Sequence, residues 1–227
     1  MRYFLFVSLS FFLLSCNKKI YQNSQEIQLS QSLTAPDLKP KFEKELYRGV
    51  IDGKFGLKKF HFSGVLYMKN FGDTATRVVF QSEMGSTFFD FGWDAKDSFM
   101  VHNIMEQMNK PALIKTLKKD FEMLLVKNMA KQPKGIYNFD RNTRENYIKF
   151  DLEKGFVYYI ADISRNIIAI ENADESKKVV VMKMSPASPF GQLADKINIK
   201  HLLAGFTIDL KKIKEDRNCL RMIFKEI

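Results

Sequence analysis

Successive residues of Lys59–Lys69 (KFHFSGVLYMK) fall alternately on two faces, and this repeat of two restricts the fold more than any other feature. A period of two is that of a β-strand, whereas a helix repeats every 3.6 residues. One face would carry Phe60, Phe62, Gly64, Leu66 and Met68, and the other His61, Ser63, Val65 and Tyr67. Short apolar-rich segments between turn residues predict further strands at Glu45–Asp52, Thr76–Glu83, Thr87–Trp93, Ser98–Asn103, Asn146–Leu152, Phe156–Ala161, Asn166–Glu171, Lys177–Met184, Ile197–Leu202 and Phe206–Ile213.

One segment has the helical period instead. Asn109-Lys110-Pro111 supplies a capping residue and a proline for the first turn of a helix. A single apolar stripe follows, made of Leu113, Ile114, Leu117, Phe121, Leu124 and Leu125. Because this stripe has to cover an apolar surface, the sequence predicts a mainly β fold in which a helix covers an antiparallel sheet. Ser185–Leu193 is expected to be a loop.

Thr87–Trp93 is apolar on both of its expected faces, with Phe89, Phe91 and Trp93 on one side and Phe88 on the other. An open sheet with one wet face would not need this pattern. It favours a curved sheet with one side toward a hollow that the helix closes. The alternative is an ordinary core that the protein's own side chains fill.

The first sixteen residues indicate where the protein works. Tyr3–Leu14 is an apolar run of twelve residues after Met1-Arg2, which is too short to span a bilayer and typical of a signal peptide. It ends in Leu13-Leu14-Ser15-Cys16, which resembles the bacterial lipobox. The resemblance implies cleavage after Ser15 and acyl groups on Cys16.

The chain is then expected to have three parts: a signal peptide (1–15), a lipidated flexible tether (16–41) and a single domain (42–227). The tether assignment rests on a polar composition without helix or strand period and on two prolines, Pro36 and Pro40. Once Cys16 carries lipid, Cys219 is the only other cysteine, which excludes a disulfide framework.

The chain is basic, with 36 Lys and Arg against 26 Asp and Glu and a formal net charge of +10. An anionic partner would fit this charge. Nucleic acid is not expected, because the protein is exported and no nucleic-acid-binding pattern occurs. The anionic headgroups of an envelope membrane fit better. The alternative is that the lysines only solvate the surface.

The order of elements resembles the LolA/LolB family of lipoprotein carriers and outer-membrane receptors. The matching features are a Ser-Gly step (Ser63-Gly64), a strand with basic and apolar residues (Arg77–Phe80), a tight turn with an apolar residue before glycine (Met84-Gly85) and a proline-led helix (Pro111–Leu125). The family usually has leucine where this chain has Met84, and its neighbour is often proline where this chain has Glu83.

This resemblance implies a curved antiparallel half-barrel with a helical lid, enclosing an apolar cavity for acyl chains. The cavity walls and lid would be Phe62, Phe80, Phe89, Phe91, Leu117 and Phe121. Met84 would be a tip that enters the membrane; the alternative is a hairpin residue folded back on the sheet.

No catalytic motif is present, and His61, His102 and His201 lack the spacing of metal ligands. We therefore expect a protein that is not an enzyme and has no cofactor beyond the acyl groups on Cys16. Its partners would be membrane lipid, the acyl chains of other lipoproteins and a periplasmic LolA-like carrier, and it would receive or insert lipoproteins at the outer membrane, facing the periplasm. The alternative is a structural or accessory lipoprotein subunit of an envelope complex.

Overall fold

The computed structural model describes residues 21, 25–27, 33–55, 58–139, 144–174 and 176–214. The expected signal peptide, the expected lipidation site Cys16 and the second cysteine, Cys219, lie outside these residues. Within them, none of the helices is long and apolar enough to cross a bilayer.

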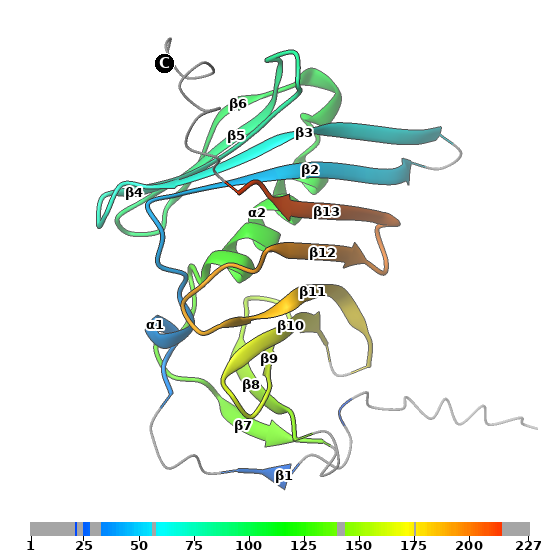
Figure 1. Ribbon diagram of the computed structural model, residues 1–227. Helices are drawn as coiled ribbons and strands as arrows, with labels where there is room; N and C mark the ends of the chain where they lie inside the picture. The colour runs from blue at the N-terminus through cyan, green and yellow to red at the C-terminus, as the bar shows by residue number, and fades with distance from the viewer. Residues whose placement is uncertain are drawn as a thin grey trace, which may run out of the picture.

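The described residues form one antiparallel sheet of thirteen strands (Figure 1). Its order is β1-β7-β8-β9-β10-β11-β12-β13-β2-β3-β4-β5-β6. The strands are β1 (Gln25–Glu26), β2 (Lys44–Phe55), β3 (Lys58–Asn70), β4 (Ala75–Gln81), β5 (Thr87–Asp94), β6 (Phe99–Ile104), β7 (Gly135–Asn138), β8 (Asn146–Asp151), β9 (Phe156–Ala161), β10 (Asn166–Ala173), β11 (Lys178–Pro189), β12 (Lys196–His201) and β13 (Phe206–Lys212).

The sheet consists of two meanders joined at one seam. Strands β2 to β6 precede the long helix in the chain and strands β7 to β13 follow it, and the seam is the pairing of β13 with β2. Figure 1 shows the sheet curving around this helix, α2 (Pro111–Leu125), which lies on the concave side. Two short helices, α1 (Ala35–Leu38) and η1 (Glu106–Met108), complete the described secondary structure. The predicted fold class, a curved antiparallel half-barrel with a helical lid, is confirmed.

The helix begins and ends where its sequence predicts, at Pro111 and Leu125. Its expected capping residue is wrong, because Lys110 occupies the N-cap position and makes no side-chain cap hydrogen bond. Val126 ends the helix in a left-handed conformation, with a φ of 52°. The loop expected at Ser185–Leu193 is also partly wrong, since β11 continues through Pro189.

The described part of the expected tether is packed on the domain. Strand β1 pairs with β7, and the Ala35 amide donates to the Lys131 carbonyl at 2.9 Å. Ala35 and Leu38 of α1 are buried, and the Lys41 amide donates to the Gly191 carbonyl. Residues 33–41 are therefore part of the folded domain, because apolar side chains at two helical positions pack against its core.

Candidate lipid-binding site

The side chains predicted as cavity walls and lid do meet on the concave face. Phe80 of β4 and Phe89 and Phe91 of β5 are at most 1% exposed, as are Leu117 and Phe121 of α2. The ring of Phe121 lies 5.8 Å from that of Phe89, and the Phe89 and Phe91 rings stack at 4.7 Å. Phe62 is half-buried and packs against this cluster.

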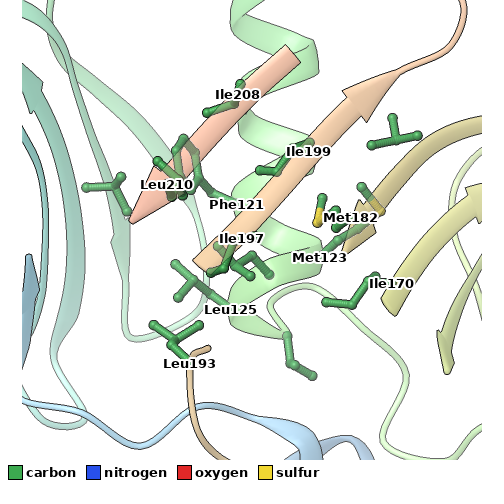
Figure 2. Close-up of a cluster of buried hydrophobic side chains, with 14 of the residues drawn as sticks. Phe121, Met123, Leu125, Ile170, Met182, Leu193, Ile197, Ile199, Ile208 and Leu210 are labelled. Carbon is green, nitrogen blue, oxygen red and sulfur yellow. The ribbon is translucent and has the colours of Figure 1, made fainter. Parts of the chain in front are cut away.

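The other half of the concave face is aliphatic. Figure 2 shows Phe121, Met123 and Leu125 of α2 among side chains from the later meander. These are Ile170, Met182, Leu193, Ile197, Ile199, Ile208 and Leu210, all buried. One helix thus covers an apolar surface to which both meanders contribute.

The space between the helix and the sheet is filled. A cavity of about 20 Å³ remains near the carboxyl end of α2, lined by Leu124, Tyr159 and Ile170 among others. Ligand pockets usually measure about 300–1,000 Å³. A larger cavity, of about 510 Å³, lies elsewhere, at the β3–β4 and β5–β6 turns, and charged residues such as Lys39, Asp94 and Lys127 line it. The expected open hollow is therefore wrong for this conformation, because the protein's own rings and aliphatic chains occupy it.

Phe88 does not lie on the opposite face as predicted. Phe80 pairs with Phe89 and Gln81 pairs with Thr87, which leaves Phe88 as the extra residue of a β-bulge. Its ring lies 4.9 Å from Phe80 and 5.2 Å from Phe62, inside the same core. The bulge thus places two consecutive phenylalanines, Phe88 and Phe89, in the same core.

Polar contacts fix the carboxyl end of α2 to the first meander. Lys127, only 4% exposed, donates to Asp97 in the β5–β6 turn at 2.6 Å. The indole nitrogen of Trp93 donates to Glu122 at 3.2 Å, and Asn128 donates to the same carboxylate at 2.7 Å. At the amino end, Pro111 and Ala112 are exposed, whereas Leu113 and Ile114 are half-buried against the core. Of the two ends of the helix, the carboxyl end is therefore the more firmly held.

A buried ionisable pair also joins α2 to the sheet. Asp120 lies inside the apolar stripe, and its Oδ2 is 2.9 Å from Nε2 of His201 on β12. The contact is short but poorly aligned for a hydrogen bond, and both side chains are nearly inaccessible. Burial raises the pKa of the Asp120 carboxyl, and His201 and Lys119 offset part of this rise. The sequence places Asp120 among apolar residues, but it gives no sign that a histidine 81 positions later is its partner.

Met84 lies at the tip of the β4–β5 hairpin and is 95% exposed. The turn is held by the Ser82 amide donating to the Ser86 carbonyl and by Gly85, whose φ of 85° suits glycine. The alternative that Met84 folds back on the sheet is wrong.

The three histidines do not form a common site. His61 bonds the exposed Asp52 at 2.7 Å, His102 lies over Gly92, and His201 is buried under α2. In the part of the chain that the structure describes, no three His, Cys, Asp or Glu side chains are placed to hold a metal ion.

No protein-family model matches this chain, and no curated protein matches its sequence. Similar solved structures exist. A LolA superfamily protein from Nitrosomonas europaea has a TM-score of 0.46 at 7% identity, covering 79% of this chain and 88% of that one. A DUF1329 family protein from Desulfovibrio piger has a TM-score of 0.44 at 11% identity, covering 76% of this chain and 84% of that one. A domain from Vibrio parahaemolyticus, described as an outer membrane lipoprotein-sorting protein domain, has a TM-score of 0.37 at 7% identity, covering 79% of this chain and 87% of that one.

Proposed function

We propose that this protein is a lipid-anchored envelope lipoprotein that binds acyl chains against the concave face of its sheet. In this role it receives lipoproteins from a periplasmic LolA-like carrier, or helps insert them at the outer membrane, without a catalytic step. One observation supports the proposal most: a curved, apolar face built from both meanders is covered by a single amphipathic helix.

Acyl binding at this face requires α2 to move away from it, because the space is filled. Exposing an acyl chain of about 16 carbons to water costs on the order of 10 kcal/mol, at about 0.8 kcal/mol per methylene. The chain can replace the side chains of Leu117, Phe121 and Leu124 as the apolar cover of the sheet. The exchange then substitutes one apolar contact for another, so its net free energy is smaller than either burial alone.

The filled interior favours a second candidate, a structural or accessory subunit of an envelope complex. Such a subunit would use the same sheet as a rigid support and would hold no acyl chain. The two candidates differ in whether lipid enters beneath α2.

Native mass spectrometry of the protein purified from membranes distinguishes them. We expect added mass from acyl lipid beyond the groups on Cys16, and competition by a fluorescent palmitate analogue. Depletion of the protein in cells should make other lipoproteins accumulate before they reach the outer membrane. A lipid-free protein with a fixed oligomeric mass, together with normal sorting, would favour the accessory subunit.

The role of Met84 can be tested separately. We expect Met84→Glu to reduce lipoprotein delivery at least several-fold with unchanged thermal stability, because a charge disfavours entry of the tip into lipid. Ile163→Glu is the matched control. Ile163 is 70% exposed and lies in the β9–β10 turn, at the opposite end of the sheet's strands from the β4–β5 turn that carries Met84. Equal delivery by both variants and the parent would remove Met84 from the mechanism.

A further inference from the structure

Arg48, Lys196 and Lys211 lie side by side on the outside of the sheet. Lys196 pairs with Lys211 across β12 and β13, and Lys211 pairs with Arg48 across β13 and β2. Residues that pair directly across antiparallel strands project from the same face, about 5 Å apart. All three are exposed. They form a row of positive charge, which we call the cation row.

The cation row lies on the convex face, away from α2. Its neighbours along the strands, Ile197 and Leu210, are buried beside the helix (Figure 2), and side chains alternate between the two faces of a strand. Lys183 and Lys200 are exposed on the same convex face. The acidic groups beside them are Asp209, which accepts from Asn198 at 2.6 Å, and Asp52, which bonds His61.

Like charges placed directly opposite each other destabilise a sheet. Among the described residues, no ion pair to an acidic group compensates any member of the cation row. An anionic surface against the convex face would convert this repulsion into attraction. Acidic headgroups supply such a surface over an area wide enough to meet all three side chains.

The amino-terminal segment independently reaches the same face. The Tyr21 hydroxyl donates to Glu171 at 2.5 Å, and its ring lies 4.3 Å from that of Tyr158. Tyr158 and Glu171 alternate with Tyr159 and Ile170, which contribute to the core under α2, so Tyr21 is on the convex side. Cys16 precedes Tyr21 by five residues, which reach at most about 18 Å when extended.

We propose that the convex face binds an anionic lipid surface through the cation row, which turns α2 away from the membrane that holds the anchor. The inference that the lipid anchor lies near the convex face rests on the lipidation of Cys16 in the proposed function. The binding of anionic lipid by the cation row does not depend on that lipidation. The lid would then face the compartment from which a carrier delivers its cargo.

Lysine footprinting of the full lipidated chain in vesicles tests this proposal. The protein is reconstituted in purely zwitterionic vesicles and in vesicles with added phosphatidylglycerol, and lysine acetylation rates are compared by mass spectrometry. We expect Lys196 and Lys211 to react about fivefold more slowly in the anionic vesicles. Lys115, exposed on α2, should react at the same rate in both, and about 0.5 M salt should remove the difference.

The variant Arg48→Glu reverses one charge of the row without removing a labelled lysine. It should abolish most of the protection of Lys196 and Lys211, whereas the control Lys115→Glu should not. Equal rates in both vesicles, or equal slowing of Lys115, would overturn the proposal. Protection in cells but not in anionic vesicles would also overturn it and assign the face to a protein partner. None of these outcomes depends on whether acyl chains bind beneath α2.

Discussion

Gly64 shows how closely the backbones approach within the first meander. A Cβ atom there would overlap the carbonyl oxygen of Gln81 and press on Ser82. Because the obstacle is backbone rather than a flexible side chain, β3 and β4 would have to move apart. We expect Gly64→Ala to lower the free energy of unfolding by about 2 kcal/mol or more, measured by urea unfolding.

The neighbouring Ser63 is exposed on the same strand and provides the control. Ser63→Ala should change stability by less than about 0.5 kcal/mol. If both variants unfold at the same urea concentration as the parent, the strands adapt to the added methyl group and the approach is not a constraint.

Asp120 should make stability depend on pH. Burial raises the pKa of its carboxyl in the folded chain above the value of about 3.9 in the unfolded chain. Its contribution to stability is therefore complete below that value and is lost as pH rises through the folded pKa. The amide of the Asp120→Asn variant stays uncharged at every pH in this range, so the free energy of unfolding of this variant should increase relative to the parent as pH rises.

Urea unfolding at a series of pH values from about 4 to 8 measures this trend. Asp94→Asn is a control whose pH trend should have the opposite sign, because amide hydrogen bonds from Ser98 and Lys96 lower the pKa of Asp94. That variant should lose stability relative to the parent at neutral pH, and the deficit should shrink as pH falls. Parallel pH profiles for Asp120→Asn and the parent would mean that the carboxyl does not titrate differently in the folded state.

At the scale of elements, α2 is the part expected to move. If acyl chains replace it on the sheet, adding a palmitoyl ligand should speed hydrogen exchange of amides in Pro111–Leu125. Strands β9 and β10, which stay paired on both sides, should keep their exchange rates. Ligand binding with no change in α2 would locate the lipid elsewhere on the protein.

Local sequence pattern predicts most of the elements but not their exceptions. The helix and the long strands are predicted because their apolar periods extend over many residues. Strand β7 and helix α1 are missed because four residues are too few to show a period. The bulge at Phe88 is missed because an extra residue changes the face without changing the composition.

The candidate site is predictable only in part. The sequence pattern predicts that the apolar residues of β4, β5 and α2 share a core, and the turn residues Met84-Gly85 predict an exposed tip. Whether that core encloses space depends on how side chains from both meanders fit together, which no local pattern contains. The same holds for the cation row, since it joins Arg48 to Lys196 and Lys211, which are 148 and 163 positions later in the sequence.

At the scale of the whole molecule, the two faces of the sheet differ in chemistry. The concave face is apolar and covered by α2, whereas the convex face carries the cation row and the site of Tyr21. In the proposed function, these separate faces for cargo and for membrane let one domain remain anchored while its lid responds to a carrier.

The seam between β13 and β2 also has a consequence for how the molecule is made. Strand β2 pairs with β3 on one side and with β13 on the other, and β13 ends at Lys212, opposite Tyr47. The second neighbour of β2 is therefore among the last described residues to be synthesised. Until then β2 offers a row of unsatisfied amides and carbonyls, an edge that readily recruits other chains. Prematurely terminated copies that stop before Phe206 should therefore be found in aggregates or as proteolytic fragments. The unpaired edge of β2 would be the feature by which cellular quality control recognises an incomplete copy.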